Sequence, residues 1–299
     1  MSRALVLSGG GPVGIAWETG IAVGLAMCDV DLSEADFIVG TSAGSAVGAQ
    51  LALGRDLNDA VSRYRRAAER QATEKPRGPR PTHGATSSQM GELRRKLAET
   101  LSSQASQQER LAAIGKFALE SNTPSEEDFV ETYRYSRGEP WPKSFVCSAV
   151  DALTGEFVVW SAESGVELDR AVASSCSVPG VFPPITMNGR RYIDGGMRSV
   201  TNADLAKGHD RVLIVSTLLT LQRSDEPRVQ RYRRTFENEV AEIVKAGGQV
   251  ATLGPNPDST TASLGQLMDP SRAFEALEEG IRQVRRGDGE ADRIREFWQ

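Results

Sequence analysis

The chain has 299 residues, of which 39% are hydrophobic and 25% charged, so its composition is that of an ordinary globular protein with one large domain or two small ones. No apolar run approaches the ~20 residues that span a bilayer, and a net charge of −5 argues against nucleic-acid binding. The three cysteines, Cys28, Cys147 and Cys176, lack C-x-x-C spacing, which argues against a disulfide framework and against a zinc cluster.

The first predicted unit is a strand, a glycine loop and a helix. Residues 4–7 are apolar and end at Ser8-Gly9-Gly10-Gly11-Pro12-Val13-Gly14, and a helix-compatible stretch continues to Leu25. This order is typical of a parallel α/β sheet. Because no apolar segment of a signal peptide precedes the strand, we expect a cytoplasmic protein.

The glycine loop by itself supports two functions. Gly9-x-Gly11-x-x-Gly14 matches the dinucleotide-binding fingerprint, and Asp29, Asp31 and Glu34 follow near the distance expected for a ribose contact. Glycines also expose backbone N–H groups at the positive end of a helix, where either a pyrophosphate or the oxyanion of an ester under hydrolysis can bind. Dinucleotide binding therefore remains an alternative at this point.

The second predicted unit carries a candidate nucleophile. The apolar run 37–39 stops at Gly40-Thr41-Ser42-Ala43-Gly44, and a helix of small residues follows until Gly54. A serine on so sharp a strand-to-helix turn has a strained backbone and a projecting hydroxyl, and glycines on either side leave room for the turn. The spacing predicts a nucleophile elbow at Ser42.

Residues 55–140 have a different character, with helical apolar spacing in four stretches, the last of which begins at Ser125. A Pro-, Gly- and Arg-rich loop over 75–84, containing His83, separates the first two helices. Residues 55–96 carry 11 Lys and Arg against 5 Asp and Glu, a net charge of +6 that leaves −11 for the remainder. We expect a helical lid whose basic part is either a solvated face or a peripheral membrane contact.

The sheet resumes after the insertion. Residues 145–150 and 156–160 read as adjacent strands, a short helix follows near 168–172, and 173–184 reads as irregular. Tyr192-Ile193 then leads into Asp194-Gly195-Gly196 at a strand end, and 211–216 is a buried strand. Because strand ends gather at one edge of an open parallel sheet, the glycine loop, Ser42 and Asp194 are expected to meet.

The predicted architecture is an α/β three-layer sandwich with a mostly parallel central sheet flanked by helices, plus the inserted helical lid. The core spans 1–225, with 55–140 as the insertion, and a C-terminal helical segment over 226–299 packs on the core. Within that segment the apolar spacing predicts helices near 229–243 and 274–284, and residues 251–255 read as a short strand that leaves the sheet.

These motifs, in this order, resemble the patatin-like phospholipase family of bacterial acyl hydrolases. The resemblance covers residues 4–216 and rests on the stretches 9–14, 40–44, 173–184 and 194–196. It implies that Ser42 attacks an ester carbonyl, that Asp194 is the base of a Ser–Asp dyad, and that no metal or cofactor is used. It further implies an oxyanion hole from Gly9, Gly10, Gly11 and Ala43, with supporting glycines at Gly14, Gly40, Gly44, Gly195 and Gly196.

The implied activity is hydrolysis of a phospholipid, lysophospholipid or related carboxylic ester through an acyl-enzyme. One departure is Pro12, which stands where the family often has Arg or Lys and supplies neither charge nor a backbone donor. Two alternatives stay open: a catalytically silent lipid-binding protein, and a triad in the order Ser42, Asp194, His209. An ordinary surface role is favoured for His209, and His83 is the weaker histidine candidate.

Overall fold

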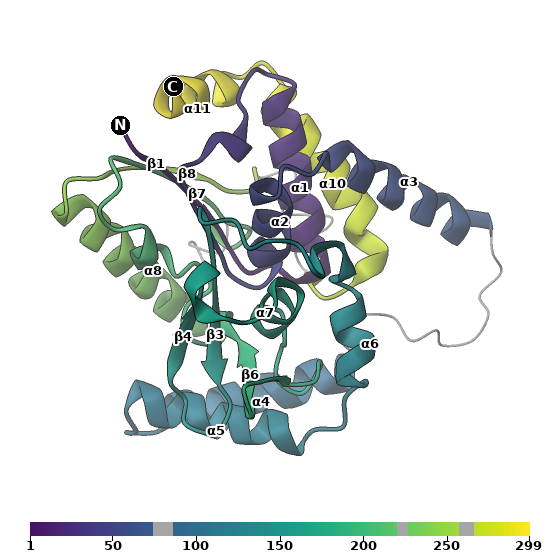
Figure 1. Cartoon of the computed structure of the whole chain (residues 1–299), viewed down its shortest axis with the longest axis vertical. Coiled ribbons are helices and arrows are strands. Elements are labelled where there is room, and N and C mark those ends of the chain that lie inside the picture. The colour runs from purple at the N-terminus through teal and green to yellow at the C-terminus, as the bar shows by residue number, and fades with distance from the viewer. Residues whose placement is uncertain (74–85, 220–226, 257–265) are drawn as a thin grey trace.

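The computed structural model describes residues 1–73, 86–219, 227–256 and 266–299 of the chain (Figure 1). The loop around His83, and with it part of the basic segment 55–96, lies outside these residues. Across the described ranges, no helix is long and apolar enough to cross a membrane.

The described strands form one mixed, eight-stranded sheet. The strand order is β5-β6-β3-β2-β1-β7-β8, and β4 pairs with β3 beside this path. The strands are β1 Arg3–Leu7, β2 Phe37–Gly40, β3 Phe145–Asp151, β4 Phe157–Trp160, β5 Ile185–Met187, β6 Arg190–Asp194, β7 Arg211–Val215 and β8 Gln249–Leu253. The five strands β3, β2, β1, β7 and β8 are parallel, whereas β4 and β6 run antiparallel to β3.

Two sequence-based expectations change in this part of the fold. Residues 251–253 do not leave the sheet, because β8 pairs with β7 in parallel register over its whole length. The segment 173–184 is not irregular from its start, because the helix preceding it continues to Ser175. This continuation brings residues 175 and 176 to the edge of the sheet where β2 ends.

Ten helices of more than one turn surround the sheet in the described residues. They are α1 Gly11–Ala26, α2 Ala43–Ala52, α3 Leu57–Thr73, α4 Ser87–Ser102, α5 Gln107–Glu120, α6 Glu126–Glu131, α7 Leu168–Ser175, α8 Pro227–Lys245, α10 Ala273–Arg285 and α11 Glu290–Trp298. As predicted, the fourth helix of the insertion begins at Ser125, whose side chain accepts a hydrogen bond from the backbone N–H of Asp128.

The alternation of side chains along β1 separates the two helical layers. Leu5 and Leu7 pack with α1, α2 and α10 on one face, whereas Ala4 and Val6 pack with α8 on the other. Figure 1 shows α8 on one side of the sheet and α1, α2 and α10 on the opposite side. The arrangement is the three-layer α/β sandwich predicted from the sequence.

The C-terminal helix α10 packs very closely on α1. A Cβ added to Gly20 would lie 2.2 Å from the carbonyl oxygen of Leu277, and one added to Gly280 would lie 2.5 Å from that of Trp17. Glycine at both positions therefore lets the two backbones touch, and this contact holds the C-terminal segment on the core.

The helices of the insertion are divided between two regions. Leu111 and Ile114 of α5 pack on Val150 and Ile193, and Figure 1 shows α5 beneath β3 and β6. By contrast, α3 packs against α1 and α10. The expectation that all of 55–140 forms a lid over the site is therefore too broad, because only its first and last helices lie beside Ser42, as described below.

Candidate active site

Ser42 occupies a sharp turn between β2 and α2. Its backbone has φ 52° and ψ −117°, a combination that L-residues rarely adopt. A Cβ added to Gly40 would lie 2.4 Å from Cα of Ser45, and one added to Gly44 would lie 2.1 Å from the carbonyl oxygen of Leu7. Glycine at these two positions is therefore a steric requirement of the turn, as the spacing predicted.

The Ser42 hydroxyl donates a hydrogen bond to Asp194. The Oγ–Oδ2 distance is 2.7 Å, and both side chains are buried. The other oxygen, Oδ1, accepts the backbone N–H of Gly196 at 2.7 Å. Burial raises the pKa of Asp194 to about 7, against the lowering effect of these two hydrogen bonds. Near neutral pH the carboxyl is therefore able both to accept and to release a proton.

Asp194 reaches Ser42 by a route that differs from the predicted one. The carboxyl ends of parallel strands were expected to bring the two together, yet β6 runs antiparallel to β3. β2 pairs with the first part of β3, as far as Cys147, and β6 pairs with the second part of β3, from Ala149 onward. β2 and β6 therefore lie one after the other along the same edge of β3. The end of β6 therefore meets the end of β2 head-on, and Asp194 faces the turn at Ser42.

Two neighbours of Ser42 come from the end of α7. The backbone N–H of Ser42 donates to Oγ of Ser175 at 3.0 Å, and the thiol of Cys176 donates to the carbonyl oxygen of Ser42 at 3.0 Å. Both polar groups of the strained peptide are thus held by side chains more than 130 positions away. Sequence reasoning missed these roles, although both residues lie in the small, polar run 173–177 that it had singled out.

The glycine loop lies beside Ser42 and presents backbone N–H groups at the start of α1. Within the part of the chain that the structure describes, the N–H groups of Gly10, Gly11 and Ala43 have no hydrogen-bond partner. Gly9 differs, because its N–H donates to the carbonyl oxygen of Val200 at 2.7 Å. The expectation that Gly9 contributes to an oxyanion hole is therefore corrected, since its amide is already used to hold the loop in place.

Gly14 and Gly195 serve close packing around the site. An added Cβ on Gly14 would lie 3.3 Å from Cβ of Ala43, so the first turns of α1 and α2 approach each other at this point. An added Cβ on Gly195 would lie 2.2 Å from Oγ of Ser148. These glycines determine how closely the loop, the elbow and the end of β6 converge.

A buried carboxyl that the sequence did not reveal lies behind the loop. Glu18 of α1 accepts the backbone N–H of Ser8 at 3.1 Å, and its other oxygen has no partner among the described residues. Burial raises the pKa of Glu18 well above its ordinary value. Burial therefore disfavours a negative charge on Glu18 beside the loop.

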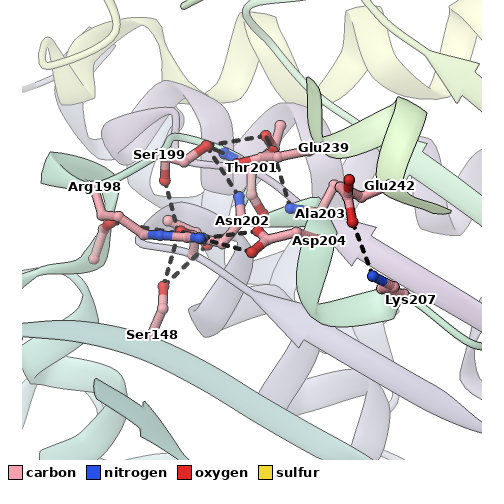
Figure 2. Close-up of polar contacts among 12 residues, drawn as sticks. Ser148, Arg198, Ser199, Thr201, Asn202, Ala203, Asp204, Lys207, Glu239 and Glu242 are labelled. Carbon is pink, nitrogen blue, oxygen red and sulfur yellow. Dashed lines mark hydrogen bonds and ion pairs between the residues drawn. The ribbon is translucent and has the colours of Figure 1, made fainter. Parts of the chain in front are cut away.

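Asn202 contacts residues next to both Ser42 and Asp194, and Figure 2 shows its side chain among those of Ser148, Arg198 and Asp204. The two protons of its side-chain NH₂ are shared among four acceptors: the carbonyl oxygen of Ser199 at 2.7 Å, Oγ1 of Thr41 at 3.0 Å, Oγ of Ser148 at 3.1 Å and the carbonyl oxygen of Gly195 at 3.4 Å. Thr41 precedes the nucleophile and Gly195 follows the aspartate. One amide group therefore fixes the separation of the two segments that carry Ser42 and Asp194.

Charged residues hold this amide in place (Figure 2). Arg198 donates to Oδ1 of Asn202 at 2.8 Å and forms a two-pronged ion pair with Asp204 at 2.7 and 2.8 Å. Glu239 of α8 accepts hydrogen bonds from the hydroxyl of Thr201 and from the backbone N–H of Ala203, the residues on either side of Asn202. The network orients Asn202 so that its NH₂ faces the dyad.

A cavity of about 300 Å³ opens beside Ser42. Its walls come from the start of α1, from α3, from α6 and the turn after it, and from residues 176–182 and 268–274. The lining is mainly apolar, and none of the described residues that form it is charged. Its apolar members include Ile15, Ala67, Ala68, Phe129, Val178, Phe182, Met268 and Phe274. This composition suits a hydrocarbon chain.

The alternative catalytic histidine lies elsewhere. His209 stacks on Phe37 with ring centroids 5.0 Å apart, and Phe37 begins β2 at the sheet edge opposite to Ser42. The geometry therefore excludes His209 from the site, and His83 lies outside the described residues. The dinucleotide alternative fails because Glu34 and the glycine loop lie at opposite ends of β1. Glu34 pairs with Arg3 at the start of β1, whereas the glycine loop follows the end of β1.

Asp31 and Asp29, the other two acids expected to contact a ribose in a dinucleotide site, have local structural roles. Asp31 caps a short helical turn by accepting the N–H of Ser33, and Asp29 lies in a turn with φ 59°. Across the described ranges, no group of three or more His, Cys, Asp and Glu side chains could hold a metal ion.

Comparison with known proteins identifies the family of this chain. The sequence model of the patatin-like phospholipase family matches residues 5–207, and the chain belongs to this family. Membership supports lipid acyl hydrolysis as the general activity. No curated protein matches the chain.

The solved structures that are similar to the chain include VipD, ExoU and a complex that contains ExoU. VipD from Legionella pneumophila shares 14% identity with a TM-score of 0.41, over 95% of this chain and 66% of VipD. The type III effector ExoU shares 18% identity with a TM-score of 0.38, over 94% of this chain and 53% of ExoU. The ExoU–SpcU complex from Pseudomonas aeruginosa shares 18% identity with a TM-score of 0.33, over 94% of this chain and 52% of the matched chain. The chain thus spans about two thirds of VipD and half of ExoU.

Proposed function

We propose that the protein is a serine lipid acyl hydrolase of the phospholipase A, lysophospholipase or carboxylesterase type, which uses Ser42 and Asp194 as a catalytic dyad. The observation that carries the proposal is the 2.7 Å hydrogen bond from the Ser42 hydroxyl to Asp194, on a strained turn beside unpaired backbone N–H groups. A buried serine paired with a base at this distance is the arrangement that nucleophilic catalysis requires.

In the acylation step, ionised Asp194 takes the hydroxyl proton as Ser42 Oγ forms a bond to the ester carbonyl carbon. The carbonyl π bond breaks, and the negative charge moves to the carbonyl oxygen. The N–H groups of Gly10, Gly11 and Ala43 stabilise that oxyanion, with the positive end of α1 behind the first two. As the tetrahedral intermediate collapses, protonated Asp194 donates its proton to the departing alcohol.

In the deacylation step, Asp194 accepts a proton from water, and the hydroxide attacks the acyl-Ser42 carbonyl. Collapse of this second intermediate releases the carboxylic acid, and Asp194 returns the proton to Ser42. A pKa of about 7 suits both steps, because the carboxyl must act in turn as a base and as an acid. Pro12 adds no charge here, so the oxyanion depends on backbone donors and the helix.

Labelling with a fluorophosphonate probe tests the dyad directly. We expect one adduct on Ser42, located by mass spectrometry, in the folded wild-type protein and none in the Ser42→Ala variant. Substitution of Asp194 by Asn should slow labelling, because the hydroxyl then lacks its base. A folded wild-type protein without an adduct would support the silent lipid-binding alternative and refute the proposal.

We further propose that the protein makes peripheral contact with anionic membranes through the basic segment 55–96. Arg63, Arg66 and Arg70 of α3 are exposed, whereas Tyr64 and Ala68 of the same helix line the cavity. Contact along this face would bring the cavity to the lipid. Binding to anionic liposomes should weaken as salt increases; salt-insensitive binding, or none, would assign these arginines to an ordinary solvated face.

A further inference from the structure

A second cavity lies beside the segment that follows Asp194. It measures about 70 Å³ and lies between α5, α8 and residues 196–200. This volume accommodates about two water molecules or one group of tetrahedral-oxyanion size. None of the residues proposed to touch the ester during hydrolysis lines it.

Arginines from three different elements converge on this cavity. Arg110 comes from α5, Arg231 from α8 and Arg198 from the segment after the dyad. No Asp or Glu among the described residues lines it. Arg198 is neutralised by its ion pair with Asp204, whereas Arg110 and Arg231 have no carboxylate partner in the described part of the chain. Arg110 instead donates to the carbonyl oxygen of Ala105 at 2.5 Å.

Like charges held together in this way are unfavourable without a counter-charge. The pKa of Arg231 is lowered, first by burial and then by the positive charges of Arg110 and Arg234. Both effects oppose the charged form, and a bound anion would reverse them. Thr100, Gln107 and Thr235 also line the cavity and add uncharged hydrogen-bonding groups.

We propose that this cavity is a phosphate-binding site, in which Arg110 and Arg231 hold the oxygens of a phosphate monoester, diester or free phosphate. Guanidinium groups match phosphate geometry and are suited to partly buried sites because they are weakly hydrated. A tetrahedral phosphate has enough oxygens to accept hydrogen bonds from both arginines and from a hydroxyl at once.

The wall of the cavity is connected to the catalytic groups. Gly196 lines it and donates its N–H to Oδ1 of Asp194, and Val200 lines it and accepts the N–H of Gly9. A phosphate bound here therefore lies behind the base and the glycine loop. The same chemistry fits the headgroup of a phospholipid substrate or a free phosphate ion, and only the headgroup source depends on the proposed hydrolase function.

The first test uses inorganic phosphate and requires no enzymatic activity. Phosphate should raise the Tm of the wild-type protein above that in sodium chloride of equal ionic strength, because it binds the folded state. The Arg231→Gln and Arg110→Gln variants should lose this rise. Arg282→Gln is the matched control, since Arg282 is exposed on α10 and its substitution makes the same charge change.

The second test distinguishes the two sources. If the site holds a headgroup, Arg231→Gln should lower kcat/KM for a short-chain phospholipid about tenfold more than for p-nitrophenyl butyrate, since a hydrogen bond to a charged group is lost. If it holds free phosphate, the two substrates should be affected equally while the phosphate-dependent Tm rise is still lost.

The proposal is overturned if phosphate gives no more stabilisation than chloride and no substrate preference appears. It is also overturned if Arg282→Gln behaves like Arg231→Gln, because a general surface-charge effect would then explain both. A protein that labels at Ser42 and yet fails both tests keeps the proposed hydrolase function and loses only the phosphate site.

Discussion

The Asp194→Asn variant separates what this residue does for catalysis from what it does to folding. Asparagine keeps the shape of the side chain and its oxygen can still accept the N–H of Gly196, but the amide cannot take a proton from Ser42. We expect ester hydrolysis to fall by about 10³-fold, the usual worth of a positioned general base. The fold should be retained, because the new NH₂ can donate to Ser42 Oγ in place of the hydrogen bond that Oδ2 accepted.

The effect on stability has the opposite sign. Burial raises the pKa of Asp194 from its ordinary 3.8 to about 7. Between these two values the folded protein holds a proton that the unfolded chain has released, so wild-type stability falls as pH rises. Each pH unit in this interval costs about 1.4 kcal/mol, which amounts to about 4 kcal/mol once the pH exceeds 7. The Asp194→Asn variant has no titrating group at this position, so its unfolding free energy does not fall with pH for this reason.

Urea unfolding of both proteins at pH 5 and pH 8 measures the effect. The unfolding free energy of Asp194→Asn relative to wild type should increase between these pH values by a few kcal/mol. The buried acids Glu18 and Glu239 titrate in both proteins and cancel in the difference. In the wild type, kcat/KM should rise with pH and reach half its maximum near pH 7, because only ionised Asp194 can act as base.

Asp210 provides a matched control at an ordinary aspartate. The pKa of Asp210 is lowered, chiefly by the backbone N–H of Ser2. Its contribution to wild-type stability is therefore lost only as pH falls below its ordinary pKa of 3.8, and the stability difference for Asp210→Asn should stay constant between pH 5 and pH 8. If the stability difference for Asp194→Asn does not change with pH, then Asp194 is already ionised at pH 5 and the assigned role of burial is wrong.

Three further substitutions test how the site is held together. Gly44→Ala should destabilise the protein by about 3 kcal/mol or more, because its Cβ would lie 2.1 Å from the carbonyl oxygen of Leu7; Gly91→Ala, in open space on α4, should be neutral or stabilising in the same thermal-unfolding measurement. Asn202→Ala should lower kcat roughly 10- to 100-fold with little change in KM, because Asn202 positions the dyad without lining the cavity; a rise in KM alone would contradict this. His209→Ala should keep most of the ester hydrolysis, and a collapse of activity would overturn the dyad.

Local features of the site could be predicted from the sequence because they depend on neighbouring residues. The turn at Ser42 needs glycine at positions 40 and 44, and the strand and helix that flank it are only a few residues away. The glycine loop before α1 and the cap at Ser125 are equally local. The order of strands and helices, together with a continuously apolar strand at 211–216, also predicted the layers, because a strand buried on both faces carries apolar residues on both of them.

The order and direction of the strands could not be predicted from the sequence, even where the residues at their ends were identified. The motif at 194–196 indicated the partner of Ser42, yet the direction of β6 is decided by its pairing with β3, which no local pattern encodes. The position of β8 in the sheet likewise follows from its pairing with β7. Strand order and direction depend on which surfaces are buried together, so they emerge only when the whole chain is packed.

The sequence by itself determined that this chain forms an α/β sandwich with a serine elbow, a glycine loop and an aspartate near one sheet edge. Only the tertiary structure decided which amides of the loop lack a partner among the described residues, that Ser175 and Cys176 hold the peptide of Ser42, and that Asn202 lies between Thr41 and Gly195. The physical reason is separation along the chain: Ser175, Cys176 and Asn202 lie more than 130 residues from the turn at Ser42, and a hydrogen bond over that distance leaves no periodic signal in the sequence.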